Sequence, residues 1–474
     1  MSELEKETSN SREIAKNFLM FVIENSSIHG FNHLADKRRH IIEYILWFIG
    51  ILLGVFGIFW LSQSTWYHYQ NNPTVVSIEN NYQEWNTIFP SITVCPDIQI
   101  EPDLNVFNEV LVKDPKSYKL ASSDIGELQT LITKISNWTY SNPSLSENNF
   151  IIDGKTPMTP SEYARLFITT KNSFTYTLNY NEIEELEDED LQVHMTEHGV
   201  CFGYLSKVSN YFNPMEWKYI RYKDKGDPFS SNPFDGDNYF QLTFIDEAGT
   251  KVFVHSPEEL PDITSKGEHL QQHALKTIGV AALSIYSSSE VYDLNIHQRQ
   301  CQFLWESNLQ ISPVYTYNAC RMQCRYNLGL KLCGCVPHVY KSFGKEEICN
   351  PDGLSCLSKN EDLLMKLRDT NGKRVECRCL PPCNDVNYVI DQERNIKWAF
   401  GCELRWGIIK YPRIRFKRSV LFGFTEVLVS IGGSAGLFLG CSVLSFVEIV
   451  YFFTLRLFWY MKKYNSTGLE KPSI

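Results

Sequence analysis

The last long apolar run of the chain contains a cluster of small residues, GGSAGLFLGCS at 432–442. At its end, Gly440-Cys441-Ser442 carries no bulky side chain to cover the backbone, and uncovered backbone carbonyls can coordinate a cation that sheds its water. Glu448 follows Cys441 by seven residues, which places both on nearly the same face of a helix. A carboxylate inside an apolar run is costly in a membrane and indicates an ion pathway or a buried pair. The segment therefore predicts cation coordination.

The glycines of this segment also fit two other patterns. Residues 432–436 match the G-x-S-x-G turn that carries the nucleophile of hydrolases. That turn needs a strand before it, a helix after it, and His and acid partners in the same domain, and an apolar run offers none of these. We therefore reject hydrolase chemistry. Gly432 and Gly436 are four apart, a spacing that suits close packing of membrane helices, and we assign these two positions to helix packing.

Two further motifs have competing interpretations. Cys333-Gly334-Cys335 followed by His338 could form part of a zinc site, but the many neighbouring cysteines favour disulfides. The basic segment 415–418, RFKR, resembles a processing site. Cleavage there would separate the last apolar run from the rest of the chain, so we favour a basic anchor beside the membrane.

Two membrane spans must position these residues. Residues 41–61 carry a single charge, Glu43, and at about 1.5 Å per residue they match the roughly 30 Å hydrocarbon core of a bilayer. The second apolar segment, 419–454, is longer than a perpendicular span needs. It must be tilted, kinked or interrupted, and its glycines are where interruption is easiest.

Two spans place both ends of the chain on one side of the membrane. The basic residues Lys37, Arg38 and Arg39 precede the first span, so we predict that residues 1–40 and 455–474 are cytosolic. The localisation expected is the plasma membrane.

The cysteines place the segment between the spans, 62–418, outside the cell. Of the 14 cysteines, 13 lie between the spans and ten of these lie within 301–383. This density indicates a disulfide framework in an oxidising compartment. Asn137, in Asn-Trp-Thr, is the one glycosylation sequon of this segment.

The cysteine spacing suggests a helix bonded to a strand. Cys320 and Cys324 are four apart and share a face of a helix, whereas Cys377 and Cys379 are two apart and share a face of a strand. Antiparallel nesting would join Cys320 to Cys379 and Cys324 to Cys377, and Cys301 to Cys383 would close the set. Many other pairings are compatible with the sequence alone.

Other features complete the expected domain. Residues 89–95 (FPSITVC), 239–246 and 251–256 read as strands, and residues 128–138 have helical spacing. The acidic run 181–192 is best explained as a solvated surface, with a wall of a cation- or proton-binding pocket as the alternative. The net charge of −10 excludes a general nucleic-acid binder. No cofactor or resident metal is expected.

Taken together, the motifs resemble the epithelial sodium channel/degenerin/acid-sensing ion channel superfamily, and most closely its arthropod pickpocket branch. The resemblance covers the whole chain. It rests on Ser27-Ile28-His29-Gly30 before the first span, FPSITVC after it, the cysteine block, and IGGSAGLFLGCS followed by FVE.

The resemblance implies an α+β membrane protein with two transmembrane helices and a large, hand-like, disulfide-rich extracellular domain, three copies of which surround one pore. It assigns Gly440, Cys441 and Ser442 to the selectivity filter and His29-Gly30 to a cytosolic re-entrant segment that affects gating. It agrees with the cysteine pairs above and implies three more, Cys95–Cys201, Cys333–Cys356 and Cys335–Cys349. Cys402 is left over.

Three positions depart from the family pattern. Val429 stands three residues before the double glycine, where the family has a small residue and where bulk tends to hold channels open. Cys441 replaces the usual Ala or Ser of the filter. No Trp stands just before Cys301, where proton-gated members have one, so proton gating is less expected.

The function expected is that of a non-enzymatic, trimeric, voltage-independent, amiloride-sensitive, sodium-preferring channel in a lipid bilayer. Glu448 would add negative potential below the filter, and Trp66, Tyr67 and Tyr69 would couple the extracellular domain to the first span. The alternative is a non-conducting accessory subunit of a heterotrimer. An ATP-gated receptor would have fewer cysteines and no Gly-x-Ser break, and a two-span nucleotidase would need a phosphate-binding glycine loop. The stimulus, whether an extracellular ligand, osmotic change, acid or touch, is not encoded in any motif that we recognise.

Overall fold

The computed structural model describes residues 16–35, 39–80, 85–97, 138–140, 176–181, 184–185, 191–214, 222–223, 226–236, 238–244, 249–341, 346–349 and 351–467. The chain forms two compact units. The first consists of Met1–Val75, Ser289–Arg299 and Ser419–Ile474, and the second of Val76–Ser288 and Gln300–Arg418. Asn137 and most of the predicted helix 128–138 and of the acidic run 181–192 lie outside the described residues.

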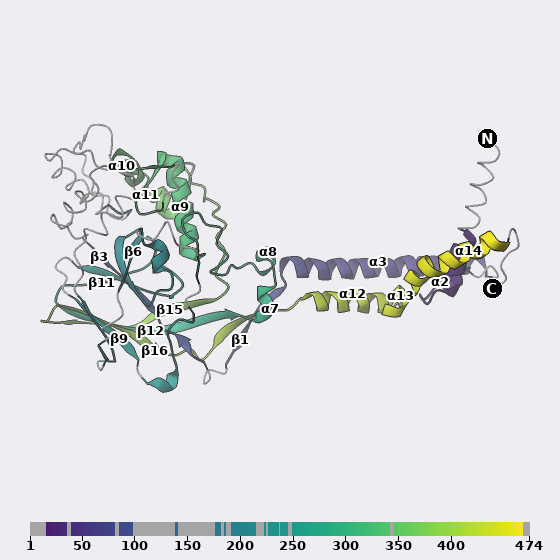
Figure 1. Ribbon diagram of the computed structural model, residues 1–474, viewed down its shortest axis with the longest axis horizontal. Helices are drawn as coiled ribbons and strands as arrows, with labels where there is room; N and C mark the ends of the chain where they lie inside the picture. Colours follow the sequence, from purple (N-terminus) through teal and green to yellow (C-terminus); the bar gives the residue numbers. More distant parts are fainter. Residues whose placement is uncertain are drawn as a thin grey trace. The chain divides into compact units, whose positions relative to one another are not determined.

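The first unit is helical. Residues 16–25 are helical, and the further helices are α2 (Phe31–Ala35), α3 (Ile41–Asn71), α7 (Ser289–Tyr292), α8 (Ile296–Arg299), α12 (Phe424–Leu439), α13 (Val443–Tyr451), a π-helical segment (Phe452–Arg456) and α14 (Leu457–Thr467). Figure 1 shows α3 running beside α12, and two glycines of α3 approach α12 closely, as described below. Within the described residues, two helices are long and apolar enough to cross a membrane, Ile41–Asn71 and Val443–Lys462.

Both apolar helices extend beyond the predicted spans. The first begins at Ile41 as expected but continues for ten residues past 61, because no Pro or Gly interrupts the chain before Pro73. The second helical region starts at Phe424, since Arg415–Val420 is a strand. It is interrupted at 440–442 and then continues to Thr467, just before Gly468.

The second unit contains two main sheets. The larger has the strand order β1-β17-β12-β16-β9-β4-β5, with β15 also paired to β12, and the smaller has the order β11-β10-β3-β7-β6. Their strands are β1 (Thr74–Glu79), β3 (Ser91–Pro96), β4 (Tyr176–Tyr180), β5 (Glu184–Glu185), β6 (Gln192–Thr196), β7 (Gly199–Tyr204), β9 (Tyr239–Phe244), β10 (Thr250–His255), β11 (Glu268–Leu270), β12 (Ala274–Ser287), β15 (Asp385–Lys397), β16 (Cys402–Lys410) and β17 (Arg415–Val420). The long strand β12 runs antiparallel to β15 and parallel to β16 and β17.

Shorter elements complete this unit. Two small ladders pair β2 (Thr87–Ile88) with β8 (Ser230–Ser231) and β13 (Cys335–Val336) with β14 (Glu347–Ile348). Short 3₁₀ turns lie at Ser209–Phe212 and Pro233–Asp235, and the helices are α9 (Tyr317–Cys333), α10 (Pro351–Lys359) and α11 (Glu361–Lys366).

The three predicted strands are present in the structure, but the first of them is buried on both faces and not on one face only. The strand predicted at 89–95 is β3, and all six of its residues are buried, so its alternating pattern does not mark a solvent-exposed face. A strand in the middle of a covered sheet is buried on both faces. The strands β9 and β10 belong to different sheets, although only five residues separate them in sequence.

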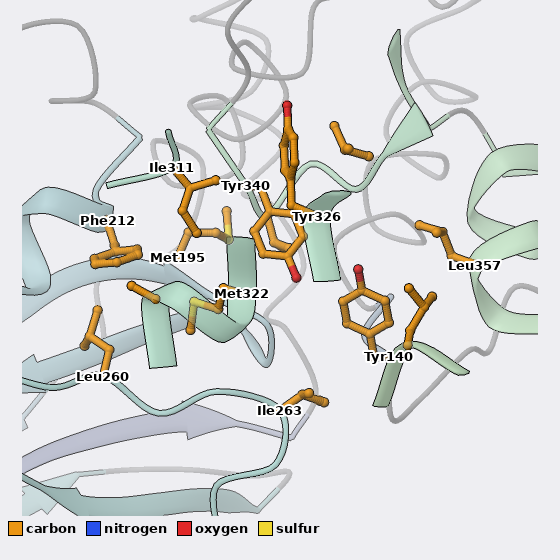
Figure 2. Close-up of a cluster of buried hydrophobic side chains, with 14 of the residues drawn as sticks. Tyr140, Met195, Phe212, Leu260, Ile263, Ile311, Met322, Tyr326, Tyr340 and Leu357 are labelled. Carbon is orange, nitrogen blue, oxygen red and sulfur yellow. The ribbon is translucent and has the colours of Figure 1, made fainter. Parts of the chain in front are cut away.

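A hydrophobic core packs around α9. It includes Met322 and Tyr326 of α9, together with Met195 of β6 and Leu357 of α10. Figure 2 shows these side chains gathered from different elements, with Tyr140 and Tyr340 among them. The core holds α9 and α10 against the end of β6.

Six disulfides reinforce this unit, and they are the six pairs given above: Cys95–Cys201, Cys301–Cys383, Cys320–Cys379, Cys324–Cys377, Cys333–Cys356 and Cys335–Cys349. The prediction of a strand at 377–379 is wrong, because this segment forms no ladder and Arg378 has a φ of +51°. The zinc interpretation of Cys333 and Cys335 is also wrong, since both sulfurs are bonded to other cysteines.

Candidate pore segment

The chain leaves the helical conformation at the predicted triplet Gly440-Cys441-Ser442. Gly440 has a φ of +63°, a left-handed conformation that favours glycine, and its N–H donates to the Gly436 carbonyl at 3.0 Å. Ser442 then begins α13, because its Oγ accepts from the backbone N–H of Ser445 at 3.3 Å. The triplet thus forms a break between two apolar helices.

The segment around His29 packs against this break. The backbone N–H of His29 donates to the Leu439 carbonyl at 3.0 Å. The His29 ring lies so close to Gly440 that a Cβ on residue 440 would stand 2.1 Å from Nδ1. Gly30 has a φ of +93°, and a Cβ there would lie 3.1 Å from a side-chain carbon of Ile51. His29-Gly30 is therefore a turn fitted against α3 and the end of α12.

Glu448 is half-buried and has a partner from the same N-terminal segment. Its Oε2 accepts from the backbone N–H of Ser27 at 3.2 Å. The Ser27 hydroxyl in turn donates to the Ser445 hydroxyl at 2.9 Å, one helical turn before Glu448. The carboxylate thus sits beside the break with one hydrogen bond from the backbone.

Aromatic side chains extend this contact toward the end of the chain. The Phe18 ring lies 5.2 Å from that of Tyr460, and the Phe21 ring lies 6.1 Å from that of Phe452. The Arg456 guanidinium stands 5.2 Å from the Phe21 ring. Sequence reasoning missed these residues, although the spacing of Phe18, Phe21 and Val22 on one helical face is a signal that could have found them.

Within the chain, the glycines that allow α3 and α12 to approach closely lie on α3. A Cβ on Gly54 would lie 3.1 Å from the Leu439 side chain, and a Cβ on Gly57 would lie 2.9 Å from the Phe438 ring. By contrast, a Cβ on Gly432 would meet no described atom within 4 Å, and one on Gly436 would meet only a backbone oxygen at 3.6 Å. Gly432 and Gly436 therefore make no close contact with α3 within this chain, and their assignment to helix packing stays a prediction.

The predicted gating positions are exposed within the first unit. The Val429 side chain is 72% exposed, and those of Trp66 and Tyr67 are 50% and 60% exposed. The Trp66 ring lies 5.5 Å from the ring of Tyr69. The structure thus brings Val429, Trp66 and Tyr67 into no shared cluster.

Other residues make the contacts at this end of α3. The His68 ring stacks on Phe422 at 5.4 Å, just before α12, and the Thr65 hydroxyl lies 3.0 Å from that of Ser430. The buried Gln298 side chain of α8 donates to the Tyr69 carbonyl at 3.2 Å. No sequence signal that we used points to Gln298, because a single glutamine has no pattern.

The geometry is that of a two-span membrane protein whose second apolar region is broken between helices and whose intervening segment is held by disulfides. The chain belongs to the amiloride-sensitive sodium channel family, whose model matches residues 22–452. The members of this family are ion channels and not enzymes.

Named relatives agree with this assignment over nearly the whole chain. The chain is 23% identical to sodium channel protein Nach of Drosophila ananassae, over 91% of this chain and 85% of that protein. It is 20% identical to pickpocket protein 28 of Drosophila melanogaster, over 96% and 81% respectively. It is 22% identical to the human bile acid-sensitive ion channel, over 92% and 85%.

Proposed function

We propose that the chain is a subunit of a trimeric, voltage-independent, amiloride-sensitive channel that prefers sodium and is gated through its extracellular domain. The observation that carries this proposal is the break at 440–442, which interrupts an apolar helix with three small residues. A membrane tolerates non-helical backbone only where it is buried in protein or lines a water-filled cavity. Three such breaks around an axis would form one narrow cation path.

Within this path, each residue has a separate task. Gly440 and Ser442 offer backbone and hydroxyl oxygens to a partly dehydrated cation, and Cys441 lies between them. Glu448 supplies negative potential below the filter, while its hydrogen bond from Ser27 holds the carboxylate in place. His29 and Gly30 support the break from the N-terminal side, so movement of this segment would change the width of the path.

The membrane arrangement follows from the same proposal. Residues 1–40 and 455–474 are cytosolic, 62–418 are extracellular, and 41–61 and 419–454 contain the spans. Six disulfides between the spans support the extracellular location, because disulfides persist in oxidising compartments. Trp66, Tyr67 and Val429 are proposed to transmit gating. The stimulus is chemical, osmotic, acidic or mechanical, and Asn137 carries a glycan.

Expression of the chain alone tests the proposal. Sodium current that is blocked by amiloride, that shows no gating when voltage is stepped, and that shifts its reversal potential when potassium replaces sodium is the expected result. Current that appears only when a second family subunit is co-expressed would support the accessory-subunit alternative. Current from neither combination, with the protein present at the cell surface, would contradict the proposal.

A further inference from the structure

An open, polar cavity of about 580 Å³ lies in the second unit, over the neighbouring strands β1, β17 and β12. Its lining residues come from those three strands and from both ends of the segment between β1 and β2: Ile78, Glu79, Asn80, Trp85, Asn86, Tyr286, Arg415 and Lys417. Two of its side chains are cationic and one is anionic. The described lining therefore has one unbalanced positive charge.

Three donors converge on the one carboxylate of the cavity. The Tyr286 hydroxyl donates to Glu79 Oε2 at 2.5 Å, Arg415 Nε donates to the same oxygen at 3.1 Å, and Lys417 Nζ lies 3.2 Å from Oε1. The hydrogen bond from Tyr286, with the two cations, holds the pKa of Glu79 below its usual value. These groups are the ones that recognise a carboxylate in protein binding sites.

Aromatic rings hold the arginine in position. The Arg415 guanidinium carbon lies 4.2 Å from the centre of the Trp85 ring and 4.3 Å from that of the Tyr286 ring. A guanidinium stacked between two rings keeps its N–H groups directed along its plane, which is where carboxylates bind. The donors are therefore fixed before any ligand arrives, which lowers the entropy lost on binding.

We propose that this cavity is a binding site for a small organic carboxylate and that Glu79 occupies its anion position in the absence of ligand. The unbalanced positive charge favours an anion over a cation. The half-buried Tyr286 and the exposed side chain of Ile78 (64% exposed) provide apolar surface for the body of the ligand, whereas Trp85 is buried beneath Arg415.

The strands that carry the site are connected directly to the helices α3 and α12. The effect of ligand binding on these helices is the only part of the inference that depends on the proposed channel function. The strand β1, which carries Glu79, follows α3 after two residues, and β17, which carries Arg415 and Lys417, precedes α12 by three. A ligand carboxylate that replaces Glu79 removes the ionic contact between these two strands. The two strands would stay paired in the sheet, and only this side-chain cross-link between the strand that follows α3 and the strand that precedes α12 would be lost.

Binding to the purified full-length protein tests the site without any measurement of current. Phenylacetate is the probe, and phenylacetamide is its uncharged control. We expect saturable binding of phenylacetate, seen by isothermal titration calorimetry, and at least about tenfold weaker binding of phenylacetamide, since a charge-assisted contact is lost. Equal binding of both compounds, or no binding of phenylacetate, would overturn the proposal.

Three variants sharpen the test. Glu79→Gln removes the internal competitor and should tighten phenylacetate binding by about tenfold. Arg415→Gln should abolish it. Lys410→Gln is the matched control, because Lys410 pairs with Asp391 on the same sheet outside the cavity, and it should leave binding unchanged. Weaker binding to Glu79→Gln than to the unaltered protein would overturn the assignment even if Arg415→Gln failed to fold.

Discussion

The imidazole of His29 lies directly against the α-carbon of Gly440, so the N-terminal segment fills the space that any side chain at residue 440 would need. The contact joins residues more than 400 positions apart, and a second contact, from the His29 N–H to the Leu439 carbonyl, accompanies it. The helix break is therefore shaped from two sides, by its own left-handed glycine and by the histidine turn.

The contact between His29 and Gly440 predicts that Gly440→Ala abolishes the current carried by the channel. The new Cβ would meet the His29 ring at 2.1 Å and would also stand in a left-handed backbone, which costs about 1–2 kcal/mol. Loss of current with protein still at the cell surface is the expected result. Gly432→Ala is the control, since no described atom lies within 4 Å of its Cβ, and it should conduct normally.

A double variant separates the two causes. His29→Ala combined with Gly440→Ala removes the clash but keeps the backbone strain, so it should recover part of the current lost in Gly440→Ala. A double variant that is no better than Gly440→Ala would show that the ring contact has no energetic weight.

The hydrogen bond to Ser27 allows the charge of Glu448 to be tested apart from its structural contact. Glu448→Gln keeps an oxygen that can accept from the Ser27 N–H at the same place, but it loses the negative charge. We expect a several-fold lower single-channel conductance at low ionic strength, where screening is weak. Unchanged conductance in Glu448→Gln, with loss of function only in Glu448→Leu, would reduce Glu448 to a structural acceptor.

A buried ion cluster should control the stability of the second unit. Arg325 Nε and Nη2 donate to the two oxygens of Glu197 at 2.6 and 2.7 Å, and Nη2 also donates to Asp262 at 2.6 Å. All three side chains are at most 1% exposed. Arg325→Met leaves the buried Glu197 without its cation and Asp262 with only Arg321, whose Nη2 lies 3.5 Å from Oδ2, and this should cost about 3–5 kcal/mol.

Thermal unfolding of the purified protein measures this effect, with Lys366→Met as the control. Lys366 forms an exposed pair with Asp362, so its loss should barely change the unfolding temperature. A similar, small change in both variants would contradict the role of the cluster.

Four titratable groups of the second unit predict how its stability depends on pH, and of these His194 and His338 are buried while His255 and Glu259 are partly exposed. Burial lowers the pKa of His194, His255 and His338 to about 4. Their contribution to stability is complete above the unfolded pKa of about 6.5 and is lost as the pH falls toward 4. Burial raises the pKa of Glu259 to about 7, so its contribution is complete below about 4.5 and is lost as the pH rises through 7.

In the pH range where all four groups titrate, the three histidines bind more protons on unfolding than Glu259 releases. Between pH 6 and 5, unfolding takes up about two protons net, so stability should fall by about 2–3 kcal/mol per pH unit on acidification. Glu259→Gln removes the opposing group and should make the fall steeper, which unfolding temperatures measured across this range would show. A shallower fall in Glu259→Gln would contradict these assignments.

Local patterns predicted the two apolar helical regions, three strands and the helix break of this chain, whereas contacts between distant segments lay beyond them. The spacing of Cys320 and Cys324 correctly predicts a helix, and the glycine-rich triplet marks the break. The prediction of a strand at Cys377 and Cys379 is wrong, because Arg378 adopts a left-handed conformation that cysteine spacing does not encode.

Long-range packing explains the other differences. Gly54 and Gly57 look like ordinary members of an apolar helix, and only the position of Phe438 and Leu439 beside them shows why they lack side chains. The bond from Gln298 to the Tyr69 carbonyl likewise depends on where the chain returns to α3. Sequence periodicity describes faces of helices but not which residue lies opposite them.

The most direct test of the proposed filter is the ratio of sodium to potassium permeability in Ser442→Cys, made in a Cys441→Ala background so that residue 441 offers no thiol. The Cys441→Ala parent is the control. We predict a lowered sodium preference in Ser442→Cys and block by an extracellular, charged thiol reagent that leaves the parent unaffected. An unchanged permeability ratio with no block by the reagent would contradict the assignment of 440–442 to the filter.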